Sequence, residues 1–428
     1  MPAVIIILLS FILILVLMRY RVPLYLGVFA SIIFLAFFIQ RGFPVIGHQF
    51  LVTGKSGEVI SLLVIILLIL LFSTALRLGG RLDRMTETFS GLVHNRRTQL
   101  ATFPALIGLL PMPGGAWFSA PMVKAIARGI PEHVGLLTAI NYWFRHIWEY
   151  WWPLYPGVLL ATSLSGLSLP HVIAVMLPMT AVVVVIGVLT IFRDMSVNWS
   201  ENPGVSEPRK RSSWAMFFAA VWPILAVVIG GVALELAREV YVASGHSFYQ
   251  PLPRTIIIAA LAIVSVATIV SDRVDMRRLL AEYADRKQLE LVAMIFAVLY
   301  YKNVLDAGGL VVRSVGELQA WHIPVWLVIV ILPALIGVVT GVVVAAIGVS
   351  FPVVLGVAAG ANLPLVPVLV VAYTAAMVGV MFSPIHFCLL LSLQYFGDTF
   401  GPVYKRITVP LLLVFACAVA LAWLYSIM

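Results

Sequence analysis

Long apolar stretches alternate with short polar segments along the 428 residues of the chain. A helix that crosses a bilayer needs about 20 apolar residues, and fewer where flanking charged side chains reach back to the surface. Ten stretches meet this requirement, at residues 3–18, 23–40, 58–77, 134–162, 169–192, 214–236, 253–271, 290–303, 364–390 and 407–426. The pattern therefore predicts an all-α polytopic membrane protein with about ten transmembrane helices.

Two further apolar stretches, at residues 99–127 and 323–360, are interrupted by glycine and proline. Backbone that leaves the helical conformation at membrane depth is tolerated only where protein or a water-filled cavity covers it. These stretches fit re-entrant hairpins better than single crossing helices. We expect both hairpins to lie inside the protein rather than against lipid.

Composition agrees with this class, since 62% of the residues are hydrophobic, 11% are charged and the mean hydropathy is +1.08. Soluble domains carry about 25% charged residues, which excludes a soluble enzyme or a nucleic-acid-binding module. With both termini outside, 20 of the 27 Lys and Arg residues fall in cytoplasmic segments and six in outer ones. Positive charge marks cytoplasmic loops, so we expect a multi-pass protein of the inner (cytoplasmic) membrane, with the lipid bilayer rather than nucleic acid as its partner.

An internal repeat divides the chain into two parts. The pentapeptide PALIG occurs at 104–108 and again at 333–337, and further matches follow in order at nearly the same interval: Ser119 with Ser350, Pro121 with Pro352, Tyr142 with Tyr373, and Pro153 with Pro384. Each copy holds five spans and one hairpin. Because five is odd, the second copy has to insert upside down, as in many secondary transporters. We therefore predict repeat one at 1–192, a polar cytoplasmic linker at 193–213, and inverted repeat two at 214–428.

The fourth span carries ionisable residues in the segment NYWFRHIWEYWWPLYPG, residues 141–157. Such residues are costly inside a membrane and mark functional sites by default. Asn141, Arg145 and Glu149 are spaced by four and would share one helix face. Arg145 is a candidate counter-charge for an anion, Glu149 a candidate tuning or titrating group, and His146 a candidate proton carrier. The alternative is that Arg145 and Glu149 only neutralise each other.

Other features of this span have simpler interpretations. Pro153 and Pro156 should break the helix, and the surrounding tryptophans fit an interfacial belt and packing surface. The second repeat offers Ser383 and His386 near Pro384 as binding groups. The spacing of His146 and Glu149 superficially resembles a metal pair, but no further histidine or carboxylate is near in sequence. We therefore predict no metal site and no cofactor, and expect Cys388 and Cys417 to be small buried residues.

The hairpin tips supply the remaining candidates. Gly114 and Gly115 allow close backbone approach, and Ser119 can start a half-helix whose N-terminal amides attract anions. The second tip offers Thr340 and Ser350 in the same arrangement. Neither tip contains Asp or Glu, so a sodium ion near Gly114, Ser119, Thr340 and Ser350 would need carbonyl and hydroxyl oxygens. The alternative is that each break only lets two helices pack.

The motifs PALIGLLPMPGGAWFSAPMV and NYWFRHIWEYWWPLYPG resemble those of an uncharacterised archaeal and bacterial membrane protein family. It is classed as a domain of unknown function within the ion transporter superfamily, with gluconate, citrate and TRAP-type permeases as relatives. The resemblance implies a homodimer with an elevator-type alternating-access cycle. It also implies fixed scaffold parts at 1–98 and 214–322, and moving transport parts at 99–192 and 323–428.

These observations favour an ion-coupled secondary active transporter, such as a symporter, for a small anionic solute, with Na⁺ or H⁺ as coupling ion. The alternatives are a cation/proton antiporter and the membrane subunit of a multi-component, TRAP-like permease. No hydrolase, kinase, nucleotide-binding or metalloprotease motif is present, so we expect no enzymatic activity.

Overall fold

The computed structural model describes residues 1–93, 95–112, 114–127, 135–193, 212–245 and 252–427. Over these residues the chain forms twenty helices and no strands, which confirms the all-α class. The helices of the first half are α1 (Ala3–Arg19), α2 (Leu24–Ala36), α3 (Gly42–Lys55), α4 (Gly57–Leu78), α5 (Arg81–Leu92), α6 (Arg96–Gly108), α7 (Gly115–Ile126), α8 (Leu136–Arg145), α9 (Pro156–Ser165) and α10 (Leu169–Ile191). Those of the second half are α11 (Trp214–Ala243), α12 (Leu252–Ser271), α13 (Met276–Tyr283), α14 (Arg286–Ala307), α15 (Leu310–Ala320), α16 (Val325–Thr340), α17 (Val343–Gly360), α18 (Leu365–Met381), α19 (Phe387–Phe396) and α20 (Phe400–Ile427).

Six of the described helices are long and apolar enough to cross a membrane by themselves: α4, α10, α11, residues Gln288–Ala307 of α14, α17 and α20. Other apolar helices are shorter, among them α1, α2, α16 and α18. These helices point to a multi-pass membrane protein, as predicted, while the number of ten crossings stays a prediction. One of the six, α17, lies within the stretch predicted as the second hairpin.

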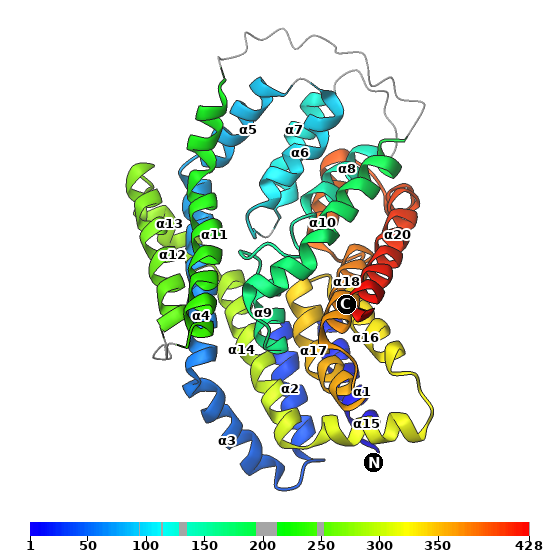
Figure 1. The fold of residues 1–428 in the computed structure, drawn as a ribbon. Helices are drawn as coiled ribbons and strands as arrows, with labels where there is room; N and C mark the ends of the chain where they lie inside the picture. Colours follow the sequence, from blue (N-terminus) through cyan, green and yellow to red (C-terminus); the bar gives the residue numbers. More distant parts are fainter. Residues whose placement is uncertain (94, 113, 128–134, 194–211, 246–251, 428) are drawn as a thin grey trace.

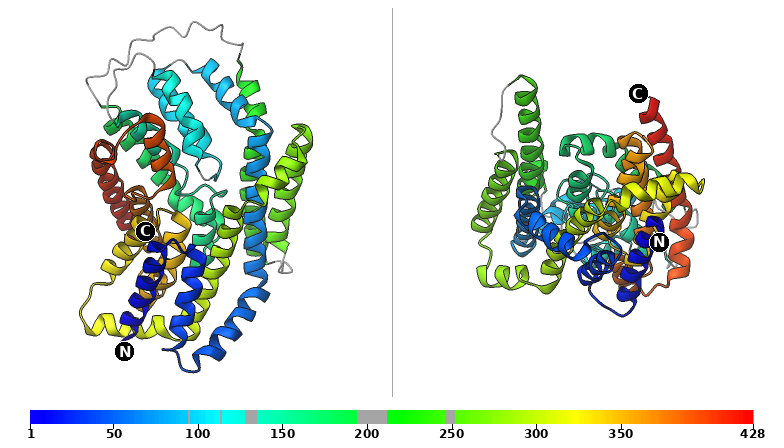
Figure 2. Two further views of the ribbon diagram at one scale, coloured as in Figure 1. Left: turned by 180° about the vertical axis from the view of Figure 1, so that it is seen from behind. Right: turned by 90° about the horizontal axis from the view of Figure 1, so that it is seen from below.

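The long helices gather into two sides of the molecule. Helix α4 packs against α12, and α12 against α11, on one side; α18 packs against α16 and α20, and α20 against α10, on the other. Figure 2 shows the same separation from behind. Helix α15 lies across the end of the molecule that holds the N-terminus, and α5 lies near the opposite end (Figure 1).

The two spans predicted at 134–162 and 364–390 are not continuous helices. Helix α8 ends at Arg145 and α9 begins at Pro156, while α18 ends at Met381 and α19 begins at Phe387. The first break starts well before Pro153, so Glu149 lies outside the helix. The prediction that Asn141, Arg145 and Glu149 share one helix face is therefore wrong for Glu149.

Helix bounds recur along the chain at the interval of the sequence repeat. Helices α4 (57–78) and α14 (286–307) are 229 residues apart at both ends, and α9 (156–165) and α19 (387–396) are 231 residues apart at both ends. Helices α10 and α20 begin at 169 and 400, again 231 residues apart. Most of the predicted linker, at 194–211, lies outside the described residues.

Candidate functional site

The two breaks, at 146–155 and 382–386, are held together by a pair of tyrosines from equivalent positions of the repeat. Tyr142 of α8 donates a hydrogen bond to the carbonyl of Met381, at 3.1 Å. Tyr373 of α18 donates to the carbonyl of Glu149, at 2.6 Å. A helix end leaves carbonyls without intrahelical partners, and in a membrane each needs a donor. Each broken span therefore supplies a donor to the break of the other.

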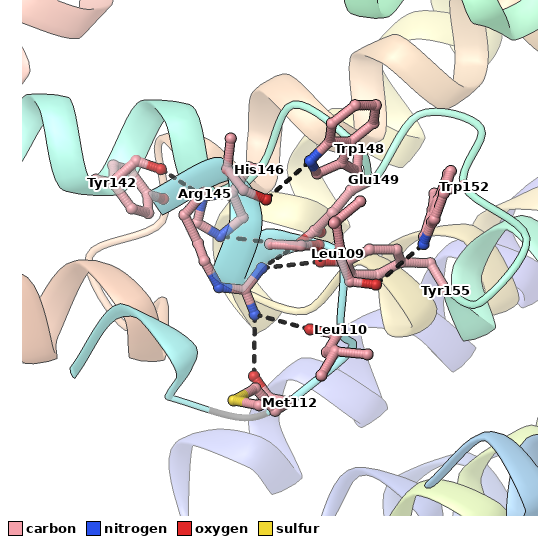
Figure 3. Close-up of polar contacts among 12 residues, drawn as sticks. Leu109, Leu110, Met112, Tyr142, Arg145, His146, Trp148, Glu149, Trp152 and Tyr155 are labelled. Atoms are coloured by element: carbon pink, nitrogen blue, oxygen red, sulfur yellow. Dashed lines mark hydrogen bonds and ion pairs between the residues drawn. The ribbon is translucent and has the colours of Figure 1, made fainter. Parts of the chain in front are cut away.

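Arg145 and side chains of the first break also satisfy carbonyls at and just beyond the end of α6 (Figure 3). The donors and acceptors are Trp148 Nε1 to Ala105 (2.9 Å), Tyr155 Oη to Gly108 (2.6 Å), Trp152 Nε1 to Leu109 (3.0 Å), and Arg145 Nη2 to Leu110 (3.5 Å) and Met112 (3.1 Å). The tryptophan rings pack on one another, as the predicted packing surface requires, while their place at a membrane interface stays a prediction. The indole and phenol groups of the break cap a helix that ends inside the protein.

Arg145 lies at the centre of this arrangement with only 2% of its surface exposed. Nη1 donates to Tyr155 Oη at 2.8 Å and lies 3.8 Å from a carboxylate oxygen of Glu149. Among the described residues, Nε has no hydrogen-bond partner. Gly115, the first residue of α7, lies against the guanidinium, because a Cβ there would be 2.6 Å from Nε. The guanidinium therefore faces the start of α7 with one donor unused.

Asn141 joins three helices of the site. Its amide donates to the carbonyl of Ala116 and to Ser392 Oγ, each at 2.9 Å, and its oxygen accepts from Ser119 Oγ at 2.6 Å. All four residues are completely buried. The structure thus unites the predicted Asn141 and Ser119 and adds Ser392 of α19, which the sequence analysis missed.

His146 and His386 meet across the two breaks. Their Nε2 atoms lie 3.0 Å apart, and a carboxylate oxygen of Glu149 lies 3.8 Å from His146 Nε2. Cys388 Sγ completes a buried cluster in which the sulfur and one nitrogen of each ring all lie within 4.8 Å of one another. The thiol was missed as a site residue because its partners are distant in sequence. The only sequence signal was its place two residues after His386.

The remaining candidates lie at the hairpin ends. Thr340 Oγ1 donates to the carbonyl of Ile336 at 2.7 Å, and Ser350 Oγ to that of Ala346 at 2.5 Å. Both hydroxyl groups therefore donate to backbone carbonyls of their own helices. Gly114 has a φ of +75° and packs against Phe387. Ser383 is buried beside the second tip. A sodium site at these residues stays a prediction, and Pro113 of the first tip lies outside the described residues.

A cavity of about 290 Å³ lies where the first break approaches the other side of the molecule. Pro153 and Leu154 of the break line it together with residues of α4, α11 and α12. Thr162, Ser163, Ser168 and the ion pair between Glu235 and Arg238 provide its polar side chains. The break therefore borders open space on the side that faces α4.

Comparison with known sequences identifies the family. The profile of a family described as protein of unknown function (DUF401) matches residues 2–427. The chain belongs to this family. No curated protein matches the sequence of this DUF401 member.

Among solved structures, the chain is similar to the YdaH transporter of Alcanivorax borkumensis, whose crystal structure is described as having an unusual topology. The TM-score is 0.58 with 14% sequence identity, and the match covers 85% of each chain. At this identity the similarity shows that the DUF401 chain shares the fold. The relation to gluconate, citrate and TRAP-type permeases stays a prediction.

Proposed function

We propose that this protein is an ion-coupled secondary active transporter that moves a small anion across the cytoplasmic membrane. The observation that carries the proposal is the buried Arg145 guanidinium, which faces the start of α7 and whose Nε has no hydrogen-bond partner among the residues that the structure describes. A helix N-terminus attracts anions through its amides and its dipole. An arginine and a helix start at one point form a site for an anionic group, near two broken helices of the kind that bind transporter substrates.

The arrangement of the two halves supports alternating access. Helices α5 and α15 occupy equivalent places in the two halves but lie at opposite ends of the molecule, as inverted repeats require (Figure 1). The structural neighbour is itself called a transporter. We propose that 99–192 and 323–428 move as the transport part against a scaffold of 1–98 and 214–322. The cavity between the first break and α4, α11 and α12 lies on this boundary.

Binding of the anion can be tested by thermal unfolding of the purified protein with carboxylates, sulfonates, phosphonates and inorganic oxyanions, each with and without sodium. A ligand that binds only the folded state raises the apparent melting temperature. We expect at least one anion to do so. In Gly115→Ala the added Cβ displaces the guanidinium, and the affinity for that anion should fall by about tenfold, which corresponds to about 1.4 kcal/mol.

Gly47→Ala is the matched control, since no described atom lies within 4 Å of a Cβ at this position. It should leave the anion response unchanged. If no anion raises the melting temperature, or if both glycine variants respond like the unaltered protein, the assignment of the anion site is wrong.

Cation/proton antiport is a second candidate, favoured by the cluster of His146, His386 and Glu149, which gathers three groups able to exchange protons. In this case a pH gradient alone should drive cation exchange in proteoliposomes. Glu149→Gln should abolish the exchange because it removes the carboxylate, while Asp306→Asn, at a half-exposed ion pair with Lys302, should not. Exchange that survives Glu149→Gln would exclude Glu149 as the exchanging group.

A further inference from the structure

The cluster of His146, His386 and Cys388 joins the two broken spans at one point. His146 follows the last residue of α8, and His386 and Cys388 lie at the start of α19. All three are buried, with 3%, 7% and 7% of their surfaces exposed. The sulfur and one nitrogen of each ring lie within 4.8 Å of one another.

The hydrogen bonds of the two rings determine which nitrogens carry protons. His146 Nδ1 lies 2.6 Å from the carbonyl oxygen of Tyr142, and His386 Nδ1 lies 2.7 Å from that of Gly341. Carbonyl oxygens only accept hydrogen bonds, so both Nδ1 atoms are donors. In the neutral rings both Nε2 atoms then carry lone pairs, which face each other at 3.0 Å. Such a pair requires a cation between its members, either a shared proton or a metal ion.

The other groups at this point favour a metal ion. A shared proton uses only the two ring nitrogens as acceptors. Here two further ligand groups lie beside the imidazoles: the Cys388 thiol is within the cluster, and a Glu149 oxygen is 3.8 Å from His146 Nε2. Two imidazoles, one thiolate and one carboxylate are ligands that zinc takes in its tetrahedral sites. The sulfur disfavours Na⁺, Mg²⁺ and Ca²⁺, which prefer oxygen.

The surroundings of the rings also fit metal ligands. A histidine that binds a metal commonly donates its other ring N–H to a backbone carbonyl or a carboxylate, which orients the ring. Both rings have this bond to a carbonyl. Ligands at zinc distances of about 2.0–2.3 Å lie roughly 3.3–3.8 Å apart, so the observed cluster needs only small side-chain movements to close around an ion.

We propose that His146 Nε2, His386 Nε2, Cys388 Sγ and a Glu149 oxygen bind one divalent transition-metal ion of the zinc class. The ion fastens the break of the first repeat to the start of α19 and so makes the two broken spans one unit. The site shares the Glu149 carboxylate with Arg145, whose Nη1 lies 3.8 Å from the same oxygen as His146 Nε2, but the proposal does not depend on any transport activity.

Cobalt provides a direct test, because Co²⁺ occupies zinc sites and reports its ligands by absorption. Untagged, chelator-treated full-length protein in detergent, kept reduced, is titrated with Co²⁺. We expect one equivalent to bind, with the visible bands of a tetrahedral site and a near-ultraviolet thiolate-to-cobalt band, both displaced by Zn²⁺. Cys388→Ser should remove the thiolate band and weaken Co²⁺ binding by at least about tenfold. Mutation of a residue that only hydrogen-bonds to a metal ligand already lowers metal affinity by about this much.

Cys417→Ser is the matched control, because this second cysteine is only partly buried and lies outside the cluster. It should keep both bands. If Cys388→Ser does not elute as a single species, His386→Gln serves instead and should lose the tetrahedral bands. Absence of the thiolate band in the unaltered protein, or its persistence in Cys388→Ser, would overturn the proposal and leave a proton shared between the two rings.

Discussion

Replacing Arg145 with glutamine is expected to lower the apparent melting temperature strongly and to abolish anion binding. The variant leaves the Glu149 carboxylate buried without its nearest cation, and removes the donor to the carbonyls of Leu110 and Met112. Breaking a buried charge pair from one side costs about 3–5 kcal/mol. We expect the affinity for the anion to fall by more than a hundredfold, or about 2.7 kcal/mol. Thermal unfolding with and without the anion measures both effects.

A double variant separates the two roles of Arg145. In Arg145→Gln/Glu149→Gln no unpaired charge remains, so part of the lost stability should return, giving a coupling of about 0.5–3 kcal/mol. Anion binding should stay absent, since the guanidinium is still missing. Trp152→Phe controls for the caps on α6, because it removes only the bond to Leu109. It should lower stability by about 1 kcal/mol and leave the anion response intact. Purely additive effects of the two glutamine changes would contradict the pairing of Arg145 with Glu149.

The membrane class and the broken helices could be predicted from sequence because both obey local rules. Apolar stretches of sufficient length form helices that lie in a membrane, and Pro153 and Pro384 lie within the two breaks. The recurrence of PALIG anticipated that helix bounds would repeat at the same interval. These inferences need no knowledge of which helices touch.

The composition of the site depended on contacts between distant segments, and there the sequence was less informative. Helical spacing placed Glu149 on the face of Arg145, although the helix ends at Arg145. In the segment after it, the side chains of Trp148, Trp152 and Tyr155 bond to the carbonyls of Ala105, Leu109 and Gly108. No sequence pattern joins Cys388 to His146, since they meet only through the packing of α19 against α8.

Tryptophan shows the same limit in another way. In membrane proteins its usual place is the interface, and a cluster of tryptophans near a predicted span end fits that rule. In the structure, the indole N–H groups of Trp148 and Trp152 donate hydrogen bonds to backbone carbonyls. A helix that ends at membrane depth needs such donors, so an aromatic cluster beside a predicted break also predicts a set of helix caps.

The glycines that end the two PALIG motifs should be intolerant of alanine. A Cβ at Gly108 would overlap the carbonyl oxygen of Arg145, and one at Gly337 would lie 2.6 Å from that of Ala376, the equivalent position in the second repeat. Both contacts are with backbone, which cannot move aside as a flexible side chain can.

We expect Gly108→Ala and Gly337→Ala each to destabilise the fold by about 1–3 kcal/mol, the cost of overpacking, seen as lower melting temperatures. Gly230→Ala in α11, where nothing lies within 4 Å of the added Cβ, should be neutral or stabilise by up to about 1 kcal/mol through helix propensity. Gly108→Ala should also weaken anion binding, because its Cβ displaces the backbone of Arg145. Gly337→Ala should leave anion binding unchanged, because its Cβ meets the backbone of the uncharged Ala376. Equal loss of anion binding in both variants would mean that general loosening of the fold, rather than the position of Arg145, governs the site.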